Sequence, residues 1–263
     1  MLKKFLKFGL CVSIFFYMAN NVLCNERPDE SLFWYHKGIS AKTHQERLDA
    51  FEKALELYMI QYNEMKNEGK TNAFLCYNIG NCYFNLKQTG QAIYYYEIAL
   101  KLLPQNALIS ENLKTALEKR SGAIDVKHNE IKEILLFFHY KISTRDRIRI
   151  MIWLSVAAFL FYLPAIFRQH TLSRYLSIIM FSLFGCIALS ICAESYFPQY
   201  EGVVVHPAYI RKDAGDAFTP IVPDPLGEGS IVRIITPENE WLKVEIGEGK
   251  RGYIRKDDLK VII

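Results

Sequence analysis

Residues 73–104 constrain the fold more than any other stretch of this 263-residue chain. Small side chains stand at helical spacings where two helices must approach closely, and bulky ones fill the space between them. The small residues are Gly80, Ala92 and Ala99, and the bulky ones are Ile79, Tyr83 and Tyr96. Pro104 ends the second segment, since proline cannot continue a helical ladder. We therefore predict two antiparallel helices joined by a turn at residues 88–90.

Six residues of this stretch follow the spacing of a tetratricopeptide (TPR) repeat, a unit of about 34 residues. They are Gly80, Tyr83, Ala92, Tyr96, Ala99 and Pro104. The stretch therefore resembles a TPR, which implies a helical platform that binds a peptide or a helix of a partner protein. In this family the concave groove is lined by the first helix of each repeat, which here begins near residue 73.

The resemblance places five residues of that first helix in the groove, because they are not expected to be needed for packing between helices. These residues are Phe74, Tyr77, Asn78, Asn81 and Asn85. The three asparagines lie near one stripe of the helix. An amide side chain can donate to and accept from the backbone of an extended peptide. A solvated polar face without a ligand is the alternative interpretation.

The TPR helical repeat domain is expected to span residues 25–121, as about two repeats and a cap. Residues 31–65 indicate helix throughout, with apolar side chains at i, i+3, i+4 and i+7 spacing. The motif of a degenerate first repeat consists of Trp34, Gly38, Phe51 and Ala54. After Pro104, leucines at 108, 113 and 117 predict a further helix with a polar outer side. That helix suits the cap that a short solenoid needs.

Residues 1–24 have the basic start, apolar centre and polar end of a secretory signal peptide. Cleavage after Cys24 is the prediction. Lipidation of Cys24 and an uncleaved anchor are the alternatives, and each of the three routes implies export.

Two apolar stretches, residues 148–167 and 175–194, are each long enough to cross about 30 Å of hydrocarbon. The loop between them, residues 168–174, is so short that the two stretches must form a transmembrane helical hairpin. Both flanking domains then lie on one side of the membrane. Residues 122–147 are expected to form a juxtamembrane amphipathic segment at the membrane surface. The last helix of the TPR domain is the alternative for them.

The export signal predicts a two-pass protein of the bacterial inner membrane, with both flanking domains on the periplasmic side. The short loop with Arg168 and Arg174 would then be cytoplasmic. The basic residues at the other end of the hairpin are more numerous, which conflicts with the positive-inside rule. They are Lys141, Arg145, Arg147 and Arg149. The first targeting segment usually dominates, so the expectation follows the export signal.

Residues 200–263 change to short alternating strands separated by glycine, proline and acidic turns, the pattern of a small β-barrel. The predicted strands are residues 202–207, 208–212, 230–236, 240–246 and 251–262. The Trp-Leu-Lys-Val and Gly-Tyr-Ile strands resemble those of a bacterial SH3-like domain, a family whose members often bind cell-wall peptides. Trp241 and Tyr253 are candidates for a ligand surface, with packing in the core or between strands as the alternative role.

The charge balance and the motifs exclude several classes of function. Residues 25–120 carry 12 basic and 12 acidic side chains, and residues 200–263 carry 9 and 11, so neither has the basic excess of a nucleic-acid binder. The chain has no CxxC, no phosphate-cradling glycine loop and no nucleophile elbow. We expect no catalytic, cofactor-binding or metal site, and we expect Cys76 and Cys82 to be small buried residues.

The order of signal, helical repeats, membrane hairpin and SH3-like barrel resembles the TPR/SH3 membrane proteins encoded with the Bacteroides aerotolerance group, the BatE type. The expected fold class is a multidomain membrane protein with an all-α TPR domain, a two-helix transmembrane hairpin and a small all-β SH3-like barrel. The resemblance implies a non-enzymatic envelope scaffold that works with von Willebrand factor A-type membrane proteins. The alternative is a peptidoglycan-binding anchor that recruits an envelope enzyme through its TPR.

Overall fold

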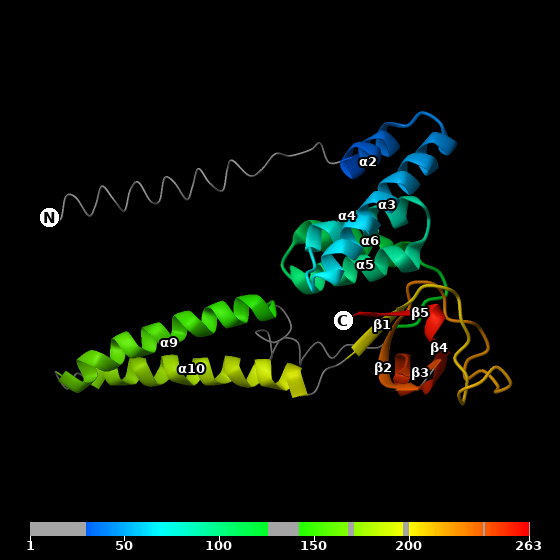
Figure 1. Cartoon of the computed structure of the whole chain (residues 1–263). Helices are drawn as coiled ribbons and strands as arrows, with labels where there is room; N and C mark the ends of the chain where they lie inside the picture. The colour runs from blue at the N-terminus through cyan, green and yellow to red at the C-terminus, as the bar shows by residue number, and fades with distance from the viewer. Residues whose placement is uncertain (1–29, 126–141, 168–170, 197–199, 239, 263) are drawn as a thin grey trace. The chain divides into compact units, whose positions relative to one another are not determined.

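The computed structural model describes residues 30–125, 142–167, 171–196, 200–238 and 240–262 (Figure 1). The predictions for residues 1–24 and for most of 122–147 lie outside the described residues. The helices are α2 (Glu30–Ser40), α3 (His44–Asn67), α4 (Ala73–Asn85), α5 (Thr89–Leu102), α6 (Ala107–Lys119), α9 (Thr144–Phe167) and α10 (Thr171–Tyr196). The strands are β1 (Tyr200–Val204), β2 (Ile231–Glu238), β3 (Trp241–Glu245), β4 (Arg251–Arg255) and β5 (Leu259–Ile262). The chain divides into two compact units between Leu57 and Tyr58, within α3.

In the first unit, α2 approaches the first half of α3 closely at Gly38. A Cβ atom on Gly38 would lie 3.1 Å from the ring of Phe51, which is buried. The same ring makes an edge contact with Tyr35, with 5.5 Å between the ring centroids. Gly38 and Phe51 therefore pack α2 against α3, and the degenerate first repeat remains a prediction.

The helix predicted for residues 31–65 is wrong at residues 41–43, where α2 has ended and α3 has not begun. Thr43 and Glu46 form a capping box at this break. The Glu46 N–H donates to Thr43 Oγ1 at 3.2 Å, and the Thr43 N–H donates to Glu46 Oε2 at 3.3 Å. The Thr-x-x-Glu spacing is the sequence signal for this helix start.

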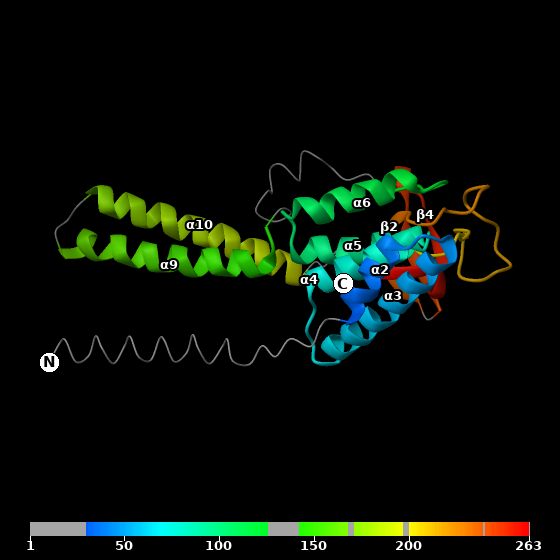
Figure 2. The ribbon, with the colours of Figure 1, turned by 90° about the horizontal axis from the view of Figure 1, so that it is seen from above.

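In the second unit, α4 packs on α5 and α5 packs on α6 (Figure 2). The closest approach of α4 and α5 is at Gly80, where a Cβ atom would lie 2.6 Å from the buried ring of Tyr96. The predicted pair of helices is confirmed. Its turn lies at residues 86–88 rather than 88–90, because α5 already begins at Thr89.

The side chains of Asn72 and Asn106 begin α4 and α6. Asn72 Oδ1 accepts hydrogen bonds from the N–H groups of Phe74 and Leu75, at 2.9 and 3.3 Å. Asn106 Oδ1 accepts from the Ile109 N–H at 3.1 Å. Each asparagine thus satisfies donors that the first turn of its helix leaves unpaired.

α9 and α10 run antiparallel and side by side (Figures 1 and 2). At one end of the pair, Ser177 Oγ donates to the Ala158 carbonyl at 3.1 Å. At the other end, Arg147 is buried and contacts Ser190 and Glu194 of α10. Polar side chains therefore join the two helices near both ends.

Within the described ranges, α10 is the helix that is long and apolar enough to cross a membrane. α9 holds the first predicted span and begins four residues earlier than expected, at Thr144. α10 likewise begins at Thr171 rather than at residue 175. The transmembrane hairpin remains a prediction.

Residues 200–262 form a five-stranded antiparallel sheet in the order β4-β3-β2-β1-β5. Strand β3 shows how the alternating pattern builds it, because Leu242 and Val244 are buried between half-buried polar and aromatic neighbours. Buried aliphatic side chains of the strands and of the segment between β1 and β2 form one core. The predicted small all-β SH3-like barrel is confirmed only as an antiparallel β-sheet.

Two of the predicted strands differ in the structure. Residues 208–212 are not a strand, because they pair only through isolated bridges at Ala208 and Arg211. Residues 251–262 form two strands, because a 3₁₀ helix at Lys256–Asp258 separates β4 from β5. The strand order leaves β4 and β5 at opposite edges, and no ladder among the described residues closes the sheet into a barrel.

Helix α5 also contacts the sheet through β1 and β5. A Cβ atom on Gly90 would lie 2.6 Å from the Val204 carbonyl oxygen. Only glycine therefore allows α5 to lie this close to β1. The Lys260 ammonium lies 5.2 and 5.3 Å from the ring centroids of Tyr94 and Tyr95. Gly90 is therefore a buried contact residue of α5, not the turn residue that we expected.

Candidate functional site

The five predicted groove residues all lie on α4 but differ in how accessible they are. Phe74 is 54% exposed, whereas Tyr77, Asn78 and Asn85 are half-buried. Asn81 is only 6% exposed. The structure thus separates an accessible part of α4, near its start, from a covered part near Asn81.

Asn81 takes part in packing between helices, contrary to our expectation. Its Oδ1 accepts hydrogen bonds from the Tyr96 hydroxyl at 2.7 Å and from Asn112 Nδ2 at 2.9 Å. Asn112 Nδ2 also lies 2.9 Å from the Tyr77 hydroxyl, to which it donates. Spacing along α4 alone does not show that α6 brings Asn112 against this amide. Asn81 therefore joins three helices and is not available to a partner.

An exposed apolar face remains beside this network. Phe74 precedes Tyr77 by three residues and Leu108 precedes Asn112 by four, so each lies about one helical turn from the Tyr77–Asn112 hydrogen bond. Leu108 is 53% exposed. Leu108 belongs to the predicted capping helix and was not among the predicted groove residues. We call Phe74, Tyr77, Asn78 and Leu108 the groove face.

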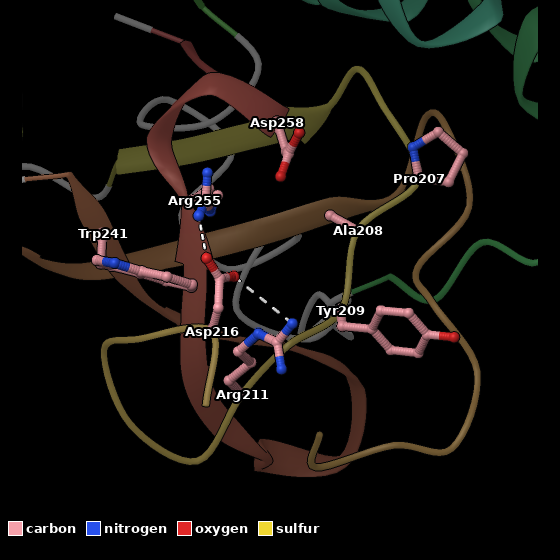
Figure 3. A pocket seen from close by; sticks show the side chains of 8 residues that line it. All are labelled: Pro207, Ala208, Tyr209, Arg211, Asp216, Trp241, Arg255 and Asp258. Atoms are coloured by element: carbon pink, nitrogen blue, oxygen red, sulfur yellow. Dashed lines mark hydrogen bonds and ion pairs between the residues drawn. The ribbon is translucent and has the colours of Figure 1, made fainter. Parts of the chain in front are cut away.

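A second candidate region is a pocket of about 170 Å³ in the sheet domain (Figure 3). It is lined by Pro207, Ala208, Tyr209, Arg211, Asp216, Trp241, Arg255 and Asp258. The Arg255 guanidinium lies 5.6 Å from the ring centroid of Trp241. Tyr253 instead pairs across the strands with Lys243, whose ammonium lies 5.4 Å from its ring. Of the two predicted aromatic residues, Trp241 lines the pocket and Tyr253 does not.

The two cysteines of α4 are buried, as we predicted. Burial raises the pKa of both Cys76 and Cys82 to about 12, so their thiols are protonated at neutral pH and are weak nucleophiles. Among the described residues, no three His, Cys, Asp or Glu side chains gather in a way that would hold a metal ion.

Residues 120–125 form a polar clamp between the end of α6 and the sheet. Arg120 Nη1 donates to Asp125 Oδ1 at 2.7 Å and to the Gly229 carbonyl at 2.8 Å. Asp125 Oδ1 also accepts from the Ile231 N–H at 3.0 Å. This clamp was not predictable from the sequence, because its contacts with Gly229 and Ile231 join residues more than 100 positions apart in the chain.

Glu97 of α5 is half-buried close to this clamp. Burial is the main cause that raises its pKa from 4.5 to about 7, followed by the negative charges of Glu201 on β1 and of Asp125. The positive charge of Arg120 acts in the opposite direction. A proton is therefore bound more tightly in the folded than in the unfolded chain between pH 4.5 and 7.

We expect the folded state to lose stability as pH rises through this window, because ionised Glu97 is poorly solvated and faces two carboxylates. The loss is at most about 3.5 kcal/mol, since one pKa unit corresponds to about 1.4 kcal/mol. Glu97→Gln should remove this part of the pH dependence, as measured by thermal unfolding of the full chain between pH 4.5 and 8. Glu118→Gln, at an exposed site on α6, is the matched control. An unchanged pH profile in Glu97→Gln would contradict the assignment.

Comparison with known proteins agrees with the helical part of this description. A search of curated proteins found no significant match to the chain. Residues 73–106, which cover α4, α5 and the link to α6, match the model of the tetratricopeptide repeat family. TPR repeats generally mediate protein–protein interaction. The segment that contains Phe74, Tyr77 and Asn78 is therefore a tetratricopeptide repeat.

Proposed function

We propose that this protein is a non-enzymatic, membrane-tethered scaffold of the bacterial envelope, whose groove face binds a peptide or a helix of a partner protein. The observation that carries this proposal is the TPR match at residues 73–106 together with the exposure of Phe74 and Leu108. Two exposed apolar side chains next to half-buried polar groups form a small surface, which is large enough to bind one short segment of a partner. The BatE-type resemblance suggests von Willebrand factor A-type membrane proteins as partners.

The tether in this proposal is the α9–α10 hairpin. Large apolar side chains on both helices are exposed, including Trp153 at 73% and Phe181 at 68%. Such side chains favour hydrocarbon over water. The polar contacts of Ser177 and Arg147 lie between the two helices, so an apolar outer surface can face lipid while polar groups stay inside the pair.

The placement of both domains on the periplasmic side follows the predicted export signal. Arg147 pairs with Glu194, and Arg149 pairs with Asp146 at 3.0 Å. These ion pairs leave the conflict with the positive-inside rule in place, because that rule counts basic residues and is little affected by acidic ones. The loop that contains Arg168 and Arg174 would face the cytoplasm, and the SH3-like sheet domain would lie on the same side as the TPR.

The scaffold proposal is tested by placing a photoreactive amino acid in the full chain in cells. At residues 74 and 108 we expect cross-links to one membrane protein, identified by mass spectrometry, and at residue 218 we expect none. Phe218 is the control because it is also exposed but lies in the sheet domain. Asn81 is unsuitable for this test, since its buried amide holds three helices together.

The identified partner segment should bind the purified chain, and Phe74→Ala with Leu108→Ala should weaken that binding at least about tenfold, which corresponds to about 1.4 kcal/mol. Asn63→Ala, at an exposed position on α3, should leave the affinity unchanged. Equal cross-linking at residues 74, 108 and 218, or unchanged affinity in the double variant, would refute the role of the groove face.

A further inference from the structure

Two arginines converge on one carboxylate in the pocket of Figure 3. Asp216 Oδ1 lies 3.6 Å from Arg211 Nη2, and Asp216 Oδ2 is paired with Arg255 Nη2. Each carboxylate oxygen thus meets a different guanidinium group, and Figure 3 shows Asp216 between the two side chains. Guanidinium groups are the side chains best suited to recognise a planar carboxylate through its two oxygens.

The other lining residues suit an organic acid. Trp241 places its ring beside Arg255, whereas the Tyr209 ring points away from the two arginines in Figure 3. The volume of about 170 Å³ is smaller than that of a typical cofactor or drug site, so it fits a carboxylate with its first attached groups. Asp258 lines the same pocket and disfavours a second negative charge. A singly charged carboxylate at the end of a larger molecule meets these conditions.

Asp216 lies on a loop that has few buried contacts. Residues 212–213 and 216–220 are exposed, and Gly215 has a φ of +147°, which glycine adopts readily. Apart from the ion pairs of Asp216, hydrogen bonds hold the loop, such as that from Arg211 Nη1 to the Phe218 carbonyl at 2.8 Å. A segment with little buried apolar surface opens at a low free-energy cost.

We propose that Arg211 and Arg255 form a binding site for a peptide carboxylate, next to Trp241, and that Asp216 occupies this site when no ligand is bound. Binding then displaces Asp216, and the apparent affinity falls with the fraction of molecules in which the site is closed. If Asp216 only fastened the loop, removing its charge would not strengthen binding. The site is separate from the groove face, so it does not depend on the proposed scaffold function.

The proposal is tested on the full chain in detergent micelles with ¹⁵N-labelled tryptophan. The indole signal of Trp241 is assigned with Trp241→Phe and is followed during titration with N-acetyl-alanyl-alanine. We expect the free acid to shift this signal and its C-terminal amide to leave it unchanged. Asp216→Asn should lower the apparent Kd at least about tenfold, because the competing carboxylate is removed. Arg211→Gln should abolish the shift.

Asp213→Asn is the matched control, because Asp213 lies on the same loop and its carboxylate accepts from the neighbouring Ala214 N–H at 2.8 Å. Its Kd should equal that of the wild type. The Trp241 signal before ligand is added reports whether the sheet domain of each variant remains folded. N-acetyl-glutamate α-amide distinguishes a side-chain carboxylate from a C-terminal one, and binding of either supports the site. Equal Kd values for wild type and Asp216→Asn, equal binding of acid and amide, or tighter binding of inorganic phosphate would overturn it.

Discussion

Gly80→Ala is expected to destabilise the TPR by about 2–4 kcal/mol, which combines overpacking of a core with the loss of a buried hydrogen bond. The new methyl group would lie 2.6 Å from the Tyr96 ring. That ring is fully buried, and its hydroxyl donates to Asn81, so it cannot move aside without breaking the link between α4, α5 and α6. The expected result is a fall of about 10 °C or more in the Tm of the helical domain, measured by circular dichroism on the full chain.

Substitutions of two other glycines show whether the loss of stability in Gly80→Ala arises from the close contact with Tyr96. A Cβ atom on Gly185 of α10 would meet nothing within 4 Å, so Gly185→Ala should leave the Tm almost unchanged. A Cβ atom on Gly38 would lie 3.1 Å from Phe51, so Gly38→Ala should have a smaller effect than Gly80→Ala. If Gly80→Ala melted at the wild-type temperature, the Tyr96 ring would have to be free to shift, and the rigid packing described for α4 and α5 would be incorrect.

Glu194→Leu is expected to destabilise the α9–α10 pair by about 3–5 kcal/mol, because it leaves a buried charge without its partner. The Arg147 side chain is 3% exposed and lies between the helices, where its Nη1 donates to Ser190 Oγ at 2.9 Å and its Nη2 to Thr144 Oγ1 at 2.8 Å. Unfolding of the full chain in mixed micelles with increasing SDS measures this loss.

A double variant and a surface variant complete this experiment. Arg147→Met with Glu194→Leu removes both charges and should recover most of the lost stability, since apolar replacements of buried ion pairs are often neutral or stabilising. Arg149→Leu removes an exposed ion pair with Asp146 and should cost less than about 1 kcal/mol. A double variant that is as unstable as Glu194→Leu alone would show that the loss arises from packing rather than from the unpaired charge.

The parts of the fold that depend on local spacing were predictable from the sequence. The contact of Gly80 with Tyr96 follows from offsets within one repeat. The alternation of Trp241 to Glu245 likewise predicts a strand with one buried face. Residues 208–212 show the same alternation but are not a strand, because the chain there pairs with β4 only at Arg211. Alternation alone therefore does not show whether a neighbouring strand is present.

The candidate sites were less predictable, because they depend on residues that are distant in the sequence. Asn81 looks like a free amide on α4 until Asn112 of α6 is placed against it. The pocket needs Asp216 from a loop and Arg255 from β4, and neither residue belongs to a recognisable motif. Trp241 could be predicted to line a ligand surface from its position in the strand. The charged residues that line the same pocket, Arg211, Asp216 and Arg255, could not.

The buried Arg147 has a consequence for how the protein is made. In the proposed membrane placement, α9 leaves the ribosome before α10 and would then carry a cation whose counter-ion has not yet been synthesised. Arg147 directly precedes the predicted span at residues 148–167, so its unpaired side chain would lie at the membrane surface until Glu194 has been made. The ion pair between Arg147 and Glu194 is therefore expected to form only after α10 has entered the bilayer beside α9, so that it fixes the finished pair rather than the first span.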